Sequence, residues 1–557
     1  MPPEWGLNET ANMNLRTLTR VVLVSCVFTS FATRAVAEET SISVAVQSMG
    51  KAGSLEAVDN NSTAARKYQN SIFEQLIALD LQDPNLSLKA GLAKEWKWIN
   101  DKTLELKLRE GVKFHNGDTM TAEDVAFSFS DERFGCLPEQ TAARDKGETT
   151  FKRADGTTGI IPPATVAASR ETEWPMLDHV EVVDTSTVRF IMKAASFDTL
   201  LRLARLNYAS IISKRGFMEA ASWNAWAAKP IGTGPYKVDR LEPGNAIRLS
   251  ANQNYWGGKP PIDKLNILVI PEAASRVNGL LSGEYDIVTD VGPDQIQLVE
   301  QSDHFNIVGV PVANIRFIAL DETKGPLKNL KVRKALTHAI DRKTIVDALW
   351  NNRTAVPQGF QHPMFGDLFA TDHKTPEYNP GLAKKLLTES GYKGERIAYR
   401  VHPDYYPNEL NVAQYNLENL RATGFNIDFS VTEKANDPGP DRMMQDLSNT
   451  VYFAAPIAIL SNNCPGGTYN TKTNPKSGMW QNDEFDKLCK VLETSTDRIE
   501  IKKSFTRALD IIENDDPGII VLHQNIILYG KRSNIEWSPS AMFAMDFSPG
   551  HFAIKNK

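Results

Sequence analysis

The chain has 557 residues, a formal net charge of −6 and 41% hydrophobic residues. This length exceeds what one hydrophobic core usually supports, so we expect two or more domains. The small net charge, with acidic and basic residues interspersed, argues against a nucleic acid or an anionic membrane as partner.

The N-terminal segment has the pattern of an export signal. Arg16 and Arg20 precede an apolar run at residues 21–31 that is too short to span a bilayer, and Ala35-Val36-Ala37 is a small-residue cleavage site. We therefore expect residues 1–37 to be a signal peptide, removed on export to the periplasm.

Two alternatives stay open in this segment. Leu23-Val24-Ser25-Cys26 resembles a lipobox, which would make Cys26 a lipid-anchored first residue, but too few apolar residues separate it from Arg20. The signal is also more ordinary when it starts at Met13 than at Met1. A freely soluble periplasmic protein is the favoured prediction.

Strand and helix signals alternate along the rest of the chain. The patterns predict strands at residues 41–46, 103–108, 187–191, 236–238, 265–270 and 285–288. They predict helices at residues 64–79, 272–281, 331–350, 381–390, 409–422 and 499–513. Residues 131–175, rich in Gly, Pro, Thr and charge, predict a long surface loop. This alternation indicates an α/β protein with largely buried sheets.

The most informative segment follows the strand at residues 103–108. Asn116-Gly117 predicts a turn, and Thr121 with Asp124 three residues later predicts a capping box at a helix start. The string from Gly111 to Val125 resembles the segment G-V-x-F-H-x-G-x-x-x-T-A-x-D-V of the extracellular solute-binding proteins of family 5. These are the dipeptide, oligopeptide and nickel-binding receptors that feed ABC importers.

Four further segments resemble the same family in its own order. They are residues 230–236 (P-x-G-T-G-P-Y), 252–260 (N-x-x-Y-W-x-G-x-P), 330–343 (V-R-x-A-x-x-x-A-I-D-R) and 378–387 (Y-x-P-x-x-A-x-x-L-L). The resemblance covers nearly the whole chain after residue 38. One such segment would also fit an unrelated fold, but five in order favour the family.

The resemblance implies a bilobal Venus-flytrap fold of the peptide-receptor type, with an extra subdomain inserted in lobe I. Lobe I would comprise residues 38–81, 205–305 and 519–557, the inserted subdomain residues 82–204, and lobe II residues 306–518. The crossings at residues 308–320 and 519–529 would be paired hinge strands.

Catalytic and metal-binding patterns are missing from the sequence. It has no G-x-S-x-G elbow, H-E-x-x-H helix or P-loop, and its nine histidines are scattered. Gly232-Thr233-Gly234 leads into a strand rather than a helix, so it predicts a packing turn, and His115 is expected to be a structural turn residue. We expect no enzyme activity, cofactor or metal. A secreted hydrolase on the same fold and a sensory receptor without transport remain alternatives.

Three cysteines follow the leader. In an oxidising compartment Cys464 and Cys489 are a plausible disulfide, worth about 3 kcal/mol for a loop of about 25 residues, and Cys136 is left over. No C-x-x-C spacing supports a redox or zinc site.

The expected ligand depends on one loop of lobe II. In the family's peptide receptors, an aspartate in a segment like W-x-x-D-x-x-D-P holds the peptide ammonium, whereas the apparent counterpart here, residues 450–458 (TVYFAAPIA), has no carboxylate. A buried ammonium without an opposing charge would cost several kcal/mol. The solute is therefore an oligopeptide or an amine-free compound, such as an opine-like conjugate, an oligosaccharide or a metal chelate. A shifted alignment that uses Asp446 stays open.

Other cleft residues are predicted from their places at strand ends, in the hinge approach or in that loop. Polar-tipped aromatic side chains suit stacking on a sugar or amide, and Arg400 could grip a carboxylate or form a salt bridge. The predicted ligand-binding residues are Gln47, Ser48, Asp290, Asn314, Arg316, Arg400, His402, Tyr405, Tyr406, Tyr452 and Phe453. The expected partners are the solute and the permease subunits of an ABC transporter, with the protein itself a monomer.

Overall fold

The structure is a computed structural model that describes residues 39–402, 406–432, 439 and 441–555. The predicted signal peptide, Cys26 and Tyr405 lie outside the described residues. The chain divides into two units, Met1–Glu39 and Thr40–Lys557, and the fold described here belongs to the second. None of the helices in the described ranges is long and apolar enough to cross a membrane.

A ten-stranded sheet runs through Thr40–Lys557 in the order β10-β11-β12-β1-β13-β18-β14-β17-β15-β16. Its first five strands are β10 (Tyr236–Glu242), β11 (Ala246–Ala251), β12 (Lys264–Val269), β1 (Ser41–Val46) and β13 (Ile287–Val288). Its last three are β17 (Met444–Thr450), β15 (Ile397–Val401) and β16 (Ile427–Val431). We call the parts built on these two groups lobe I and lobe II.

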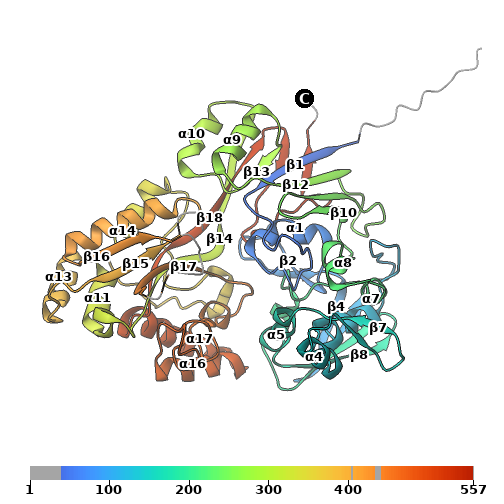
Figure 1. Cartoon of the computed structure of the whole chain (residues 1–557), viewed down its shortest axis with the longest axis horizontal. Helices are drawn as coiled ribbons and strands as arrows, with labels where there is room; N and C mark the ends of the chain where they lie inside the picture. The colour runs from blue at the N-terminus through green and yellow to red at the C-terminus, as the bar shows by residue number, and fades with distance from the viewer. Residues whose placement is uncertain (1–38, 403–405, 433–438, 440, 556–557) are drawn as a thin grey trace, which may run out of the picture. The chain divides into compact units, whose positions relative to one another are not determined.

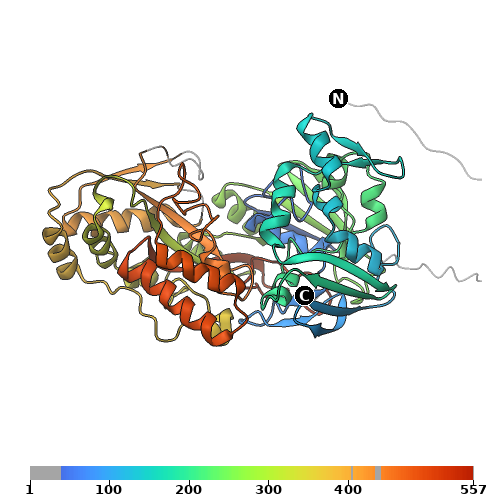
Figure 2. The ribbon, with the colours of Figure 1, turned by 90° about the horizontal axis from the view of Figure 1, so that it is seen from below.

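Two long strands, β14 (Phe305–Leu320) and β18 (Ile519–Arg532), connect the lobes as an antiparallel pair (Figure 1). Their register shifts between Pro311 and Ile315, where proline also lacks the amide that a ladder needs. On one side of this shift β18 pairs with β13, and on the other side β14 pairs with β17. The predicted pairing of the two crossing strands is confirmed, and the view from below shows the same two-part arrangement (Figure 2).

The helices cover both parts of the sheet. In chain order they are α1 (Thr63–Ile72), α2 (Ala122–Ser128), α3 (Asp131–Phe134), α4 (Pro138–Asp145), α5 (Ala164–Glu173), α6 (Thr199–Leu203), α7 (Lys214–Met218), α8 (Trp223–Ala228), α9 (Ala273–Ser282), α10 (Ile296–Glu300), α11 (Leu330–His338), α12 (Arg342–Thr344), α13 (Pro380–Glu389), α14 (Glu409–Thr423), α15 (Ile457–Leu460), α16 (Asp483–Thr494) and α17 (Arg498–Asp510). At the start of α2 the Thr121 amide donates to Asp124 Oδ2 at 2.9 Å, as the capping-box prediction requires.

A separate four-stranded sheet, in the order β4-β5-β9-β8, lies between the two lobe I segments of the chain. Its strands are β4 (Ala93–Asn100), β5 (Thr103–Leu108), β9 (Thr187–Met192) and β8 (Leu177–Asp184). The smaller strand pairs are β2 (Ile77–Leu79) with β3 (Leu88–Ala90), β6 (Thr150–Lys152) with β7 (Thr158–Ile160), and β19 (Ile535–Trp537) with β20 (Phe552–Ile554).

The prediction of a surface loop at residues 131–175 is wrong. The segment forms α3, α4, the β6–β7 hairpin and α5, and it buries Ala143, Phe151 and Ile161 in a small core of its own. Its polar and glycine residues end short elements: Ser130 caps α3, and Gly135, with φ 77°, closes it.

Two predicted helices are shorter than expected. The helix predicted at residues 64–79 ends at Ile72, and a strand follows at Ile77–Leu79. The turn at Gly232 packs directly on this helix end: a Cβ at Gly232 would lie 2.2 Å from the Ile72 carbonyl oxygen, and the Gly234 amide donates to that oxygen at 3.0 Å. The helix predicted at residues 331–350 breaks at Asp341, whose carboxylate accepts from the Thr344 amide at 3.1 Å and starts a new turn.

Cys464 and Cys489 form a disulfide with Cα atoms 5.8 Å apart, the pairing predicted from the sequence, and Cys136 is free. Cys489 lies in α16, and both paired cysteines are buried in the core cluster that also contains Trp480. The disulfide therefore joins α16 to the chain just after α15.

Candidate ligand-binding site

A cavity of about 50 Å³ lies where the two lobes meet. Lobe I, lobe II and the crossing strand β18 all contribute to it, through Gln47, Ser48, Thr63, Ala64, Lys67, Asp290, Tyr406, Pro407, Asn525, Ile526, Ile527 and Phe543. Four of these, Gln47, Ser48, Asp290 and Tyr406, are among the residues predicted from the sequence. In this conformation the cavity is smaller than the several hundred Å³ of typical ligand pockets.

The lobe I wall is built by one strand and one helix. Gln47 and Ser48 directly follow β1, and α1 begins at the cavity with Ser62 as its N-cap, whose hydroxyl accepts from the Ala65 amide at 3.2 Å. The positive end of the α1 dipole therefore faces the space between the lobes, where it favours negative charge.

A buried ion pair closes this wall. Lys67 Nζ contacts Asp290 Oδ2 and donates to Thr289 Oγ1 at 3.2 Å, and the Thr289 hydroxyl donates to Asp290 at 2.5 Å. Burial opposes the charged form of Asp290, but the nearby charges of Lys67 and Arg276 outweigh it and hold its pKa below the usual value. The pair is thus a fixed, internally neutralised part of the wall.

On the lobe II side, Tyr406 rests on a buried arginine. The Arg316 guanidinium lies 4.6 Å from the Tyr406 ring centre and donates to Glu409 Oε1 at 2.5 Å. The Tyr406 hydroxyl forms a 2.5 Å hydrogen bond with Ser448 Oγ. Arg316 is itself buried behind the ring, so it positions Tyr406 and does not line the cavity.

Asp446 extends this group into what we call the acidic cluster: Arg316, Glu409, Asp446 and Tyr399. Asp446 accepts from the Tyr399 hydroxyl at 2.6 Å inside lobe II. Burial and the charge of Glu409, only partly offset by Arg316, raise the pKa of Asp446 to about 7. Asp446 is not among the residues that line the cavity.

Tyr452 and Phe453 face guanidinium groups of the other lobe. Arg66 and Arg205 lie 4.4 and 4.9 Å from the centre of the Tyr452 ring. Arg202 and Arg205 lie 4.9 and 5.7 Å from the centre of the Phe453 ring. We call these three arginines with the two rings the arginine cluster.

Other predicted residues have different roles. Arg400 donates to Asp428 and Asp441 at 3.1 and 2.8 Å, so its guanidinium is already paired and the salt-bridge alternative holds. The Asn314 side chain on β14 donates to Ser448 and Thr450 of the neighbouring strand β17 at 3.1 and 2.8 Å. His402 is half-buried, is absent from the cavity lining, and immediately precedes residues outside the described ranges.

Several residues of the site are not among those predicted from the sequence. Thr63 and Lys67 of α1 and Phe543 of the C-terminal segment line the cavity. Arg66 of α1 and Arg205, just after α6, are not among the lining residues and lie against Tyr452, which does not line the cavity either. For α1 a signal exists, since a Ser62 cap directly after a strand-end loop places the first helical turn at the sheet edge. The sequence around Arg205 contains no comparable signal.

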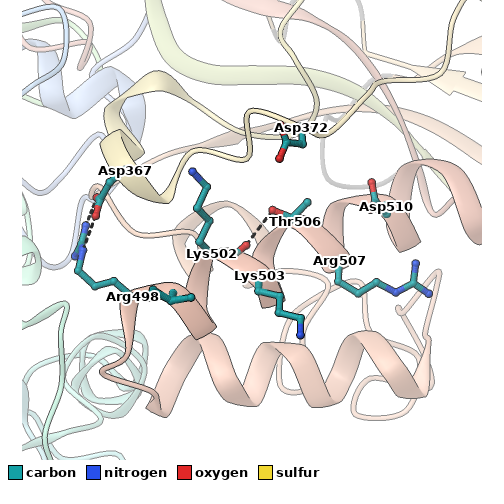
Figure 3. Close-up of a pocket in the computed structure, with 9 residues that line it drawn as sticks. Asp367, Asp372, Arg498, Lys502, Lys503, Thr506, Arg507 and Asp510 are labelled. Atoms are coloured by element: carbon teal, nitrogen blue, oxygen red, sulfur yellow. Dashed lines mark hydrogen bonds and ion pairs between the residues drawn. The ribbon is translucent and has the colours of Figure 1, made fainter.

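A larger hollow of about 500 Å³ lies between α17 and residues 363–372 (Figure 3). All its lining residues belong to lobe II, and it is open to solvent along α17. Arg498 donates to Asp367 at 2.8 Å, and the Thr506 hydroxyl donates to the Lys502 carbonyl at 2.9 Å, so these groups satisfy one another. The hollow does not join the lobes, and we place the candidate site in the interlobe cavity instead.

The family model for bacterial extracellular solute-binding proteins, family 5 (middle), matches residues 87–461. The chain belongs to this family. Its members are extracellular or periplasmic binding proteins that deliver peptides or small solutes to ABC permeases, and they are not enzymes.

Similar proteins agree with this assignment. The dipeptide-binding protein of Escherichia coli K12 is 26% identical over 461 residues, which cover 78% of this chain and 81% of that protein. The periplasmic binding protein DppA of Helicobacter pylori, solved with the peptide STSA, has a TM-score of 0.75 at 19% identity, covering 93% of this chain and 98% of that one. AgaA from A. tumefacien R10, solved with agropinic acid, has a TM-score of 0.70 at 19% identity, covering 93% and 99%. The predicted bilobal fold is confirmed.

Proposed function

We propose that this protein captures a polar solute without a free ammonium group in the interlobe cavity and hands it to an ABC permease. Residues of both lobes support the location, because Ser48 and Lys67 of lobe I meet Tyr406 of lobe II around one cavity. A site shared by two lobes can bind its ligand by hinge closure, with the ligand stabilising the closed form.

The hinge in this proposal is the β14–β18 pair. Its register shift between Pro311 and Ile315 interrupts the ladder between the parts that pair with lobe I and those that pair with lobe II. Bending there would move Tyr406 and Tyr452 away from α1 and open the cavity to the solute.

The observation that carries the ligand class is the surrounding of Tyr452. Residues 450–458 contain no carboxylate, and two guanidinium groups of lobe I, those of Arg66 and Arg205, lie 4.4 and 4.9 Å from the centre of the Tyr452 ring. A solute ammonium placed here would meet like charges in a buried environment, which costs several kcal/mol. AgaA, solved with agropinic acid, indicates that this fold serves ligands other than peptides.

Thermal unfolding of the purified protein with dipeptides, tripeptides, their N-acetylated forms and neutral trisaccharides tests this function. Ligand at about one hundred times its dissociation constant should stabilise the protein by about 2.7 kcal/mol. We expect stabilisation by amine-free compounds only, and recovery of the compound unchanged. Stabilisation by ordinary peptides that is reduced by N-acetylation would contradict the proposal.

We also propose that the protein acts in the periplasm after cleavage before Glu38. The leader pattern of residues 13–37 supports this location. Mass spectrometry of the exported protein tests it, since a first residue other than Glu38, or a lipid on Cys26, would contradict it.

A further inference from the structure

Arg66 and Arg205 lie side by side in an unusual position for cations. They are only 1% and 7% exposed, and both lie against the Tyr452 ring, which belongs to the other lobe. Arg66 projects from the first turns of α1, and Arg205 comes directly after the C-cap of α6. Two buried guanidinium groups thus share one aromatic neighbour.

Their hydrogen-bonding capacity is only partly used. Arg66 Nη2 donates to Asn207 Oδ1 at 2.8 Å, whereas Arg66 Nε and Nη1 and Arg205 Nε are buried without a hydrogen-bond partner among the described residues. Buried N–H groups that stay unpaired are costly, and more so on a charged side chain. Three donor nitrogens of Arg66 and Arg205 are therefore free to bind an acceptor that the described residues do not provide.

The arginine cluster also carries more positive than negative charge. Arg202 donates to Asp198 at 2.8 Å, and Arg205 is paired with Glu173. Within the described residues, Arg66 has no carboxylate at ion-pair distance, and its hydrogen-bond partner is the neutral Asn207. One positive charge is left over.

A guanidinium group cannot correct this imbalance by losing its proton. Burial, together with the charge of Arg66, lowers the pKa of Arg205 to about 10, and burial also lowers the pKa of Arg66. Both groups still carry their charge near neutral pH. An anion from outside the chain is the remaining way to balance them.

The Tyr452 ring is a weaker partner than such an anion. A ring face attracts a cation by its quadrupole, but it accepts no charge-assisted hydrogen bond. Because Tyr452 lies in lobe II and the arginines in lobe I, opening at the β14–β18 hinge would withdraw the ring and expose the free donors. The N-terminus of α1, one turn before Arg66, adds a dipole of the same sign.

We propose that Arg66 and Arg205 bind a carboxylate of the solute, so that the substrate class is amine-free carboxylic acids. This inference rests on the proposed function, whose site it makes more specific. Tyr452 would close over the bound acid group from lobe II, and Asn207 would hold Arg66 in place through its side-chain carbonyl.

The test measures binding of matched probes to the full-length exported protein by calorimetry. The probes are N-acetyl-alanyl-glutamate, its diamide, the free peptide alanyl-glutamate, and a phosphomonoester of similar size. We expect the acetylated diacid to bind at least about tenfold more tightly than its diamide, the free peptide and the phosphomonoester.

Variants assign the effect to the arginines. Arg66→Gln should weaken binding of the diacid by about tenfold to a hundredfold and leave binding of the diamide unchanged, and Arg66→Lys should give an intermediate loss. Arg109→Gln is the matched control, because Arg109 also lies 4.4 Å from an aromatic ring centre, but that ring is Trp256 of lobe I and not Tyr452 of lobe II. If Arg66→Gln does not fold, as judged by its thermal unfolding, Arg66→Lys and Arg205→Gln carry the test.

The outcomes separate the two proposals. Equal binding of the diacid and its diamide, or equal binding by Arg66→Gln and Arg109→Gln, overturns the carboxylate site and leaves an amine-free receptor standing. Preferred binding of the phosphomonoester, or no binding of any acid at about 1 mM, also overturns the carboxylate site. Preference for the free peptide overturns the proposed function itself.

Discussion

The arginine cluster and the acidic cluster are both buried and both unbalanced in charge, but with opposite signs. Arg66 lacks a carboxylate, whereas Arg316 is shared by two carboxylates, Glu409 and Asp446. The acidic cluster can correct its imbalance alone, because a carboxyl group with a pKa of about 7 holds a proton below about pH 7. The arginine cluster cannot, since guanidinium groups keep their protons.

This difference indicates a structural role for the acidic cluster and a ligand-binding role for the arginine cluster. The acidic cluster lies within lobe II and supports Tyr406 from behind, so its balance does not depend on the hinge. The arginine cluster spans both lobes through Tyr452 and Phe453, so its partner can change when the lobes move. Sign of charge and position relative to the hinge together indicate where an external anion binds.

The largest effect is expected from removing the cation of the acidic cluster. Arg316→Leu would leave Glu409 and Asp446 buried together without an opposing charge, and we expect a loss of about 3–5 kcal/mol in the free energy of unfolding. Urea unfolding at pH 7 measures it. Arg498→Leu, which removes an exposed arginine whose partner Asp367 is also exposed, is the control. A loss below about 1 kcal/mol would show that Arg316 does not balance the cluster.

The second largest effect is expected from a substitution that places a carboxylate within the arginine cluster. Tyr452→Glu would place a carboxylate beside Arg66 and Arg205, so we expect the affinity for N-acetyl-alanyl-glutamate to fall by about tenfold or more. Tyr452→Phe keeps the ring and should stay within about twofold. Calorimetry on the two variants checks this, and equal affinities in both would contradict a shared anion site.

The acidic cluster should also be visible in the pH dependence of stability. The pKa of Asp446 is raised to about 7 in the folded protein, above its unfolded value of about 3.9, so its contribution is present below about pH 4 and is lost as the pH rises to about 7. Asp446 should lower the unfolding free energy over this range by up to about 1.4 kcal/mol per pH unit. Asp446→Asn should therefore reduce the slope, of which Glu74, whose pKa is also raised to about 7 by burial, keeps a part.

Asp441 provides a control for this pH profile, because its pKa is lowered and not raised. Hydrogen bonds from Arg396, with Arg400, lower the pKa of Asp441, so its contribution is present above the usual carboxyl pKa and is lost only at lower pH. Asp441→Asn should therefore leave the slope between about pH 4 and 7 intact. An unchanged slope in Asp446→Asn would refute the proton-holding role.

The smallest effect is expected at Arg400. Its partners Asp428 and Asp441 are 41% and 47% exposed, so Arg400→Gln should cost at most about 1 kcal/mol of stability and change solute affinity by less than about twofold. Urea unfolding and calorimetry check both. A strong loss of affinity would return Arg400 to the binding site.

A comparison of Arg400 with Arg66 shows how much of the site could be predicted from the sequence. Arg400 follows a strand pattern and is a reasonable cleft candidate from its place in the chain, but its partners are 28 and 41 residues away and neutralise it. Arg66 gives no such signal, because a helical arginine is ordinarily exposed. Its role depends on Tyr452, which comes from the other lobe. Ser48 and Tyr406 could be predicted because the loops that follow strands lie at the sheet edge.

The sequence by itself determined the short-range features and the family. The strand at Ser41–Val46, the capping box of Thr121 with Asp124, and the ordered motifs of family 5 all depend on residues a few positions apart. Only the tertiary structure decided which charges are buried together, since burial and ion pairing depend on groups that distant segments bring into contact. That is why Asp446 and Arg66, both ordinary in the sequence, have such different roles in the folded protein.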